Sequence, residues 1–219
     1  MRPSPDDRLL AISEERAGVE PTELDVGRAP VGLAFSSDGC WLYATSEVGR
    51  IAGGGCAASS SRGTGPLGTV STIAVGPDVP PHVTSVAGVG CDPVRIVLSP
   101  DGSLAFVSLR GDDQVAAFRT EALRVGNGRP TSTVKLGPAP VGLALSTDGR
   151  SLWIANSNRF DQDASGSISC VAVGTGGKLT AVSKVVSGAF PRELYRLPDG
   201  RIIETVFGSN MLQTLPARC

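Results

Sequence analysis

Three charged residues stand where other copies of a repeated phrase carry valine or glycine. Arg192 occupies the first position after a proline, and Arg95 and Glu193 each occupy the second. A guanidinium group binds a carboxylate or phosphate through two parallel hydrogen bonds, and a free carboxylate can act as a general base. We therefore predict a site for a small anionic ligand, in which Arg95 and Arg192 bind the anion and Glu193 is the catalytic base or orients the substrate.

A structural explanation competes with this one. Arg196 and Glu204 are polar in the same copy as Arg192 and Glu193, so the whole copy could be a terminal cap with one wet face. Arg95 lies in an internal copy, where this explanation does not apply. It is the stronger single candidate.

A second group of candidates lies in the segments that follow the second strand of each unit. Arg110, Asn156 and Arg159 fall in the segments 109–113 and 156–163. In a radial arrangement of sheets these turns share one rim, so the three residues could face a bound anion. The alternative is that they are ordinary solvated loop residues.

Other chemistries have weak support. Asp161 and Asp163 lack the ligand spacing of an EF-hand loop, and His82 has no metal-binding or catalytic neighbour in register. The segment 63–68 spells G-x-G-x-x-G, but it contains Pro66 and leads into a strand rather than a helix. We predict neither a metal nor a cofactor.

Composition limits the classes of partner. The chain has 219 residues and a formal net charge of −1, so no strong field attracts nucleic acid or a membrane surface. No apolar run approaches the ~20 residues that cross a bilayer. The first residues lack the apolar core of a signal peptide, so a cytoplasmic location is the default expectation, with secretion open if the N-terminus is truncated.

The cysteines suggest no disulfide framework. There are five, an odd number, and none form a C-x-x-C pair. This pattern favours free, partly buried thiols over disulfides or a zinc site.

The candidate residues are positioned by a phrase that occurs four times. It has the form G-x-x-P-x7-D-G and reads GRAPVGLAFSSDG, GCDPVRIVLSPDG, GPAPVGLALSTDG and GAFPRELYRLPDG, from Gly27, Gly90, Gly137 and Gly188. Such self-similarity indicates one supersecondary unit repeated along the chain. A Gly/Ser-rich insertion at 49–68 lengthens the first unit.

Each unit is predicted to be a four-stranded antiparallel sheet. After the proline, apolar residues alternate, which is typical of a strand, and Asp-Gly then closes a tight turn. A second strand follows, with Tyr43, Phe106, Trp153 or Glu204 five residues after the aspartate. Third and fourth strands complete the unit, and a radial array protects their edges.

These motifs resemble the YVTN-type and lactonase-like β-propellers, which include 6-phosphogluconolactonases. The resemblance rests on phrases such as 99–119 and 166–194 and spans nearly the whole chain from Ser4. Two departures stand out. Family members usually have seven blades, whereas this chain has about four and a half units. A histidine often follows the family's leading proline, where this chain has valine or Arg192.

We thus predict an all-β propeller of four-stranded antiparallel blades, with about four to five blades in this chain. The expected boundaries are a partial blade at 1–28 and blades at 29–79, 90–137, 138–188 and 189–215. The segment 21–27 could supply a closing strand to the last blade. If the ring is incomplete, self-association could close it.

For function, the first hypothesis is a small-molecule site at the mouth of the central channel. It would hydrolyse or rearrange a lactone-like or carboxylate-bearing compound. The second hypothesis is a non-catalytic scaffold that binds another protein through its rim loops, chiefly the insertion at 49–68. The third is a cyclase-like enzyme that shapes a reactive substrate in the channel.

Overall fold

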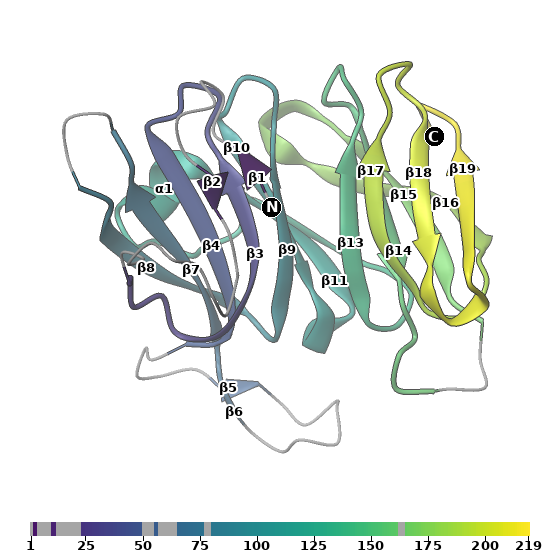
Figure 1. Ribbon diagram of the computed structural model, residues 1–219, viewed down its shortest axis with the longest axis horizontal. Coiled ribbons are helices and arrows are strands. Elements are labelled where there is room, and N and C mark those ends of the chain that lie inside the picture. Colours follow the sequence, from purple (N-terminus) through teal and green to yellow (C-terminus); the bar gives the residue numbers. More distant parts are fainter. Residues whose placement is uncertain are drawn as a thin grey trace.

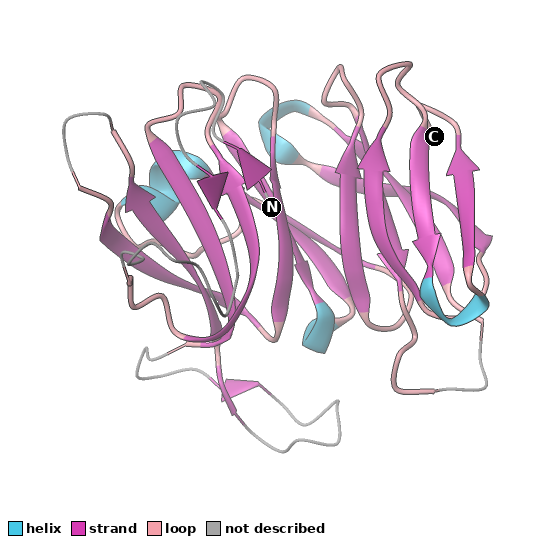
Figure 2. Cartoon of the chain, in the orientation of Figure 1, coloured by secondary structure: helices cyan, strands magenta, loops and turns pink. Residues whose placement is uncertain are grey.

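The structure is a computed structural model that describes residues 2–3, 10–11, 23–49, 55–56, 65–76, 80–161 and 165–219. Within these residues the protein is built almost wholly from antiparallel sheets (Figures 1 and 2). The predicted all-β class with four-stranded blades is confirmed.

Four sheets follow one another along the chain, and each is a simple meander. The first contains β3 (Arg28–Phe35), β4 (Trp41–Val48), β7 (Gly68–Ala74) and β8 (His82–Gly90). The second contains β9 (Pro93–Leu98), β10 (Leu104–Leu109), β11 (Gln114–Arg119) and β12 (Ser132–Lys135). The third contains β13 (Pro140–Leu145), β14 (Ser151–Asn156), β15 (Ser167–Val173) and β16 (Leu179–Val186). The fourth has β17 (Pro191–Arg196), β18 (Ile202–Val206) and β19 (Met211–Leu215).

The remaining elements are short. Two-stranded pairs form between β1 (Arg2–Pro3) and β2 (Leu10–Ala11), and between β5 (Gly55–Cys56) and β6 (Gly65–Pro66). Helical turns are α1 (Thr120–Arg124), η1 (Arg110–Asp112), η2 (Thr175–Gly177) and η3 (Phe207–Ser209).

The sheets stand side by side in sequence order, with their first strands β3, β9, β13 and β17 as neighbours in a row (Figure 1). Each junction between sheets has its own apolar core. Tyr43 and Phe118 lie in the core between the first and second sheets, Phe106 and Ile154 in the next, and Trp153 and Leu194 in the third. Burial of these side chains stabilises the row.

A polar contact also recurs at the junctions. The Thr45 hydroxyl accepts the Gly32 amide at 2.9 Å and donates to the Val94 carbonyl of the next sheet at 2.9 Å. Ser108 makes the same link, accepting the Arg95 amide at 3.0 Å and donating to the Val141 carbonyl at 2.8 Å. One hydroxyl thus satisfies a backbone donor and joins two sheets.

The Asp-Gly turns are held by a serine two residues before the aspartate. Ser36, Ser99 and Ser146 each donate to that carboxylate and accept an amide five residues further on. These hydroxyl hydrogen bonds lower the pKa values of Asp38, Asp101 and Asp148. A lowered carboxyl pKa means that the stabilisation is present at neutral pH and lost as the pH falls through the folded-state value.

The last unit departs from this turn and shifts its register. Leu197 stands where the other units have serine, and its amide bonds the carbonyl four residues on rather than five. Glu204 consequently pairs with Leu194. It therefore matches Ala44 and Ile154, not the aromatic residues Tyr43 and Trp153, and the sequence-based alignment was wrong by one residue.

Glu204 is fully buried. Its Oε1 accepts the Ser187 hydroxyl, and its Oε2 has no hydrogen-bond partner. Burial raises the pKa of this carboxyl, with the Ser187 hydrogen bond opposing the shift. The charged form is therefore disfavoured in the folded protein.

Two disulfides contradict the prediction of free thiols. Cys56 is bonded to Cys91, and Cys170 to Cys219; Cys40 is free and exposed. The Cys56–Cys91 bond joins the insertion of the first sheet to the residues just before the second sheet. The Cys170–Cys219 bond joins β15 of the third sheet to the C-terminal residues that follow the fourth. Sequence spacing missed them because the partners meet only after the sheets stack.

The segment before β3 lies on the first sheet of its own chain. Leu24 and Val26 pack beside the apolar cluster of that sheet, and the Val26 carbonyl accepts the hydroxyls of Ser46 and Ser71. The described residues of the predicted closing strand at 21–27 therefore do not reach the last sheet, which stands at the opposite end of the row (Figure 1).

We predict that Gly142→Ala destabilises the junction between the third and fourth sheets. A Cβ there would lie 2.5 Å from the Arg192 carbonyl oxygen, which belongs to the backbone of the next sheet. The overlap should lower the free energy of unfolding by about 1–3 kcal/mol in urea denaturation. Gly174→Ala is the control, since its Cβ would have no contact closer than 3.6 Å. Equal effects of the two changes would contradict the close approach.

We predict that Glu204→Gln stabilises the fold at high pH. The amide keeps the shape but removes the cost of a buried charge, so the free energy of unfolding should rise by about 1 kcal/mol at pH 8. Because the folded-state pKa of Glu204 is raised, the difference should shrink as the pH falls and the carboxyl takes up a proton. The exposed Glu121→Gln is the control; a gain independent of pH would contradict the assignment.

Candidate functional site

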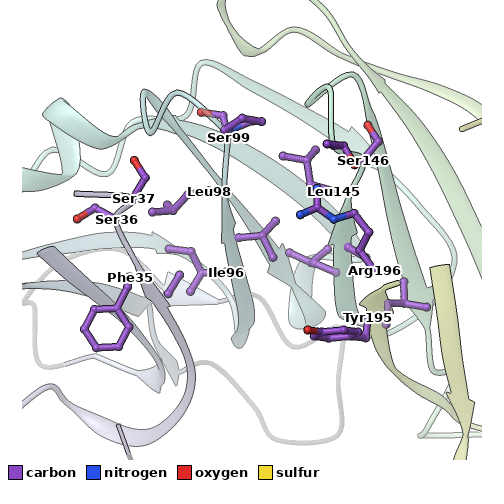
Figure 3. A pocket seen from close by; sticks show the side chains of 17 residues that line it. Phe35, Ser36, Ser37, Ile96, Leu98, Ser99, Leu145, Ser146, Tyr195 and Arg196 are labelled. Atoms are coloured by element: carbon purple, nitrogen blue, oxygen red, sulfur yellow. The ribbon is translucent and has the colours of Figure 1, made fainter. Parts of the chain in front are cut away.

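The first strands of the four sheets line an open cavity of about 580 Å³ (Figure 3). Its walls are aliphatic and backbone surface from β3, β9, β13 and β17, with serines of the Asp-Gly turns at one end. Phe35 and Tyr195 lie at opposite ends of this row of strands. The lining is about equally polar and apolar, because serine and threonine residues of the turns join the aliphatic side chains.

Arg95 and Glu193, both predicted site residues, contact each other, but neither is among the residues that line the cavity. The Arg95 Nε donates to Glu193 Oε2 at 3.3 Å, and its Nη2 forms a close ion pair with Oε1. The residues that follow them, Ile96 and Leu194, line the cavity wall. The Arg95 side chain is 22% exposed and that of Glu193 41%, so solvent and ligands can reach both.

The ion pair spans one intervening strand. Arg95 is on β9 and Glu193 on β17, with β13 between them in the row. The residue of β13 at the matching position is Gly142, which has no side chain to obstruct the contact. Arg95 Nη1 also donates to the Val31 carbonyl on β3 at 3.3 Å. The Arg95 guanidinium therefore contacts both β17 and β3, the first strands of the last and first sheets.

Arg192 does not join this pair. Its guanidinium lies over the rings of Phe190 and Phe207, at 6.0 and 5.6 Å from their centroids. The two rings pack edge to face at 5.4 Å. The predicted trio therefore separates into a contacting pair and one arginine that stacks on aromatic rings.

Arg110, predicted as a rim residue for anions, is an internal cation. It is only 3% exposed and pairs with Glu47 at 2.9 Å and Asp92 at 3.5 Å. Phe160 covers it at 5.9 Å. Two carboxylates already neutralise this guanidinium, which therefore joins the first two sheets.

The other two rim candidates have different surroundings. Asn156 is fully buried and donates to the hydroxyls of Ser167 and Ser169, so its side chain supports the third sheet. Arg159 is exposed and lies over Phe160 and Phe190. Arg110 and Arg159 thus both lie over the ring of Phe160.

Arg196 lines the cavity but was not among the predicted site residues. It was read as part of a polar terminal unit, but it is exposed and lines the cavity near Leu145 and Ser146 (Figure 3). The available signal was its place on the first strand of a unit, five residues after the leading proline, where the other units have apolar residues.

The remaining sequence candidates supply no further site. In the part of the chain that the structure describes, no group of three His, Cys, Asp or Glu residues could hold a metal ion. Asp163 lies outside the described residues, and His82 Nδ1 contacts the Pro80 carbonyl at 3.0 Å. Among the described helices, none is long and apolar enough to cross a membrane.

Solved structures share this architecture. A candidate 6-phosphogluconolactonase of Bacteroides uniformis matches 84% of the chain with a TM-score of 0.66 at 20% identity, over 49% of its own length. The periplasmic gluconolactonase of Pseudomonas aeruginosa matches 85% with a TM-score of 0.54 at 20% identity, over 56% of its length. Hydrazine synthase of Kuenenia stuttgartiensis matches 91% with a TM-score of 0.60 at 17% identity, over 53% of its length.

The chain therefore has the fold of the lactonase-like β-propellers. It spans about half the length of the solved structures it matches. No protein-family model and no curated protein matches its sequence. Because one fold carries lactonases and hydrazine synthase alike, activity has to be argued from the site.

We predict that Arg110→Met destabilises the protein far more than Arg159→Met. Removing Arg110 leaves Glu47 and Asp92 without their shared cation, which typically costs about 3–5 kcal/mol for a buried pair. Arg159 is exposed, so its replacement should change the free energy of unfolding by less than about 0.5 kcal/mol. Similar losses in thermal denaturation would contradict the internal role of Arg110.

Proposed function

We propose that this chain is a lactonase-like propeller whose channel cavity binds a sugar acid or its lactone. Arg95 binds the carboxylate or the lactone carbonyl, and Glu193 acts as the general base. Arg196 adds positive charge farther along the cavity. The lactonase-like neighbours support the fold class, and the residues beside the cavity support the chemistry.

One observation carries the proposal: a carboxylate already sits on Arg95. Both Glu193 oxygens contact the guanidinium, in the two-pronged arrangement that Arg makes with carboxylate ligands. Glu193 therefore acts as an internal substitute for the ligand. Since exposed ion pairs are worth about 0–1 kcal/mol, a ligand that gains further contacts in the cavity can displace it.

The proposed reaction is hydrolysis of the ring ester. Glu193 takes a proton from water as the water oxygen adds to the lactone carbonyl carbon, and Arg95 stabilises the developing oxyanion. The ring C–O bond then breaks, and the leaving alkoxide receives the proton from Glu193. The product forms as a carboxylic acid, which loses its remaining proton to solvent, and Arg95 binds the resulting carboxylate.

The test is hydrolysis of D-glucono-δ-lactone and its 6-phosphate, followed in a pH-stat. We expect Glu193→Gln to lower kcat by about 100-fold or more, the range of a general base. Arg95→Ala should lower kcat/KM and abolish thermal stabilisation by gluconate. Arg95→Lys should restore part of the binding, since it keeps the charge without the planar fork.

Arg201→Ala is the matched control. Arg201 is an exposed arginine that pairs with Asp199 on a surface turn. It should leave turnover and gluconate binding unchanged. Turnover above the uncatalysed rate that survives both Arg95→Ala and Glu193→Gln would reject these roles. Absence of turnover and of gluconate binding in the parent chain would reject the proposed function.

A further inference from the structure

The last sheet has an open apolar face and an open edge. It has three strands, whereas the other three large sheets have four. Tyr195 on β17 is 66% exposed and Leu212 on β19 is 68% exposed. Their counterparts in the second sheet, Val97 and Val115, pack in the core shared with the third sheet. The exposed face of the last sheet thus corresponds to the face of the second sheet that packs against the third.

The sheets alternate in type, so the second and fourth correspond. Directly after its second strand, each of these two sheets makes a 3-10 turn, η1 or η3, ending at a residue with left-handed backbone, Asp113 or Asn210. Among the described residues, the first and third sheets make no 3-10 turn at this place. The second and fourth sheets also carry Arg95 and Glu193 at the position where the first and third have glycine.

The first and third sheets also begin alike. Residues 27–35 read GRAPVGLAF and residues 137–145 read GPAPVGLAL. The residue before the leading proline has a left-handed backbone in all four sheets, with φ between 48° and 53° at Ala29, Asp92, Ala139 and Phe190, so the likeness of the first and third sheets rests on their sequences. In the third sheet this phrase docks on the second: the Ala139 amide donates to Asp113 Oδ1 at 2.8 Å, and the Val141 carbonyl accepts Ser108 at 2.8 Å.

The fourth strand of the second sheet runs directly into this phrase. β12 pairs with β11, placing Val134 opposite Val115, and three residues later the chain reaches Gly137. The segment before Gly27 has the same spacing, with Leu24 where β12 has Val134. Leu24 and Val26 already lie beside the first sheet, as Val134 and Leu136 lie beside the third. In the described part of the chain, residues 23–27 pair with no strand.

We propose that a second copy of this chain docks head to tail on the last sheet. Residues 23–27 of the second copy add the fourth strand beside β19, with Leu24 opposite Leu212. Its β3 packs on β17 and β18 as β13 packs on the second sheet. Adding a strand satisfies the open edge, and the apolar faces bury one another.

A second copy is the proposed occupant because its residues 27–35 match residues 137–145, which pack on the second sheet. Residues 27–35 repeat the phrase that already docks on a sheet of the same type. Within one chain β3 and β19 lie at opposite ends of the row, so the segment cannot reach its own last sheet in this arrangement (Figure 1).

Sedimentation velocity of the 219-residue chain tests the contact. We expect the mass of two chains, which falls to one chain in Leu212→Glu and separately in Leu24→Lys. Val182→Glu is the control, since Val182 is 53% exposed on β16 but lies outside the proposed contact. It should leave the assembly intact, and circular dichroism should show that all variants remain folded.

Mixing the two single variants distinguishes head-to-tail docking from a face-to-face dimer. In a head-to-tail pair, one junction brings the introduced carboxylate against the introduced ammonium group, and the other junction keeps both leucines. Equimolar Leu212→Glu and Leu24→Lys should therefore regain the two-chain mass. A monomeric parent chain overturns the proposal. So does a parent dimer that survives Leu212→Glu, or variants that stay monomeric when mixed.

Discussion

The close approach of the four first strands is the constraint on which the rest of the structure depends. At Gly32 and Gly142 a side chain would collide with the backbone of the next sheet, so those junctions need glycine. At the other two positions the side chains are Arg95 and Glu193. Gly32 and Gly142 allow neighbouring first strands to approach closely. Because Gly142 has no side chain, Arg95 can also reach across β13 to Glu193. Packing and the candidate site therefore have one geometric origin.

This arrangement also explains why charge is tolerated at the junctions. Arg110 lies between Glu47 and Asp92, and the Arg95–Glu193 pair remains partly wet beside the cavity. Glu204 is the exception, because its Oε2 is buried without a partner and burial raises the pKa of its carboxyl. The turn before β18, which begins at Leu197, is one residue shorter than in the other sheets and places Glu204 there. Glu204 is therefore buried because of the strand register that pairs it with Leu194.

Much of the fold could be predicted from sequence because its signals are local. The leading proline, the alternating apolar residues and the Asp-Gly turn each fix a strand or a hairpin within one unit. The contact of Arg95 with Glu193 could be anticipated because both occupy the same position of the repeat. What failed depends on relations between units: the disulfides, the internal pairing of Arg110, the aromatic surroundings of Arg192 and the cavity position of Arg196. The register of Glu204 failed because one missing serine changes a turn.

The central claim is that strands from separate sheets converge so that Arg95 and Glu193 interact. A double-mutant cycle with Arg95→Met and Glu193→Gln tests it directly, using the free energy of unfolding in urea at low salt. The account predicts a favourable coupling of about 0.5 kcal/mol, within the range for partly exposed ion pairs, that weakens as salt is added. Strict additivity of the two substitutions at every salt concentration would contradict it.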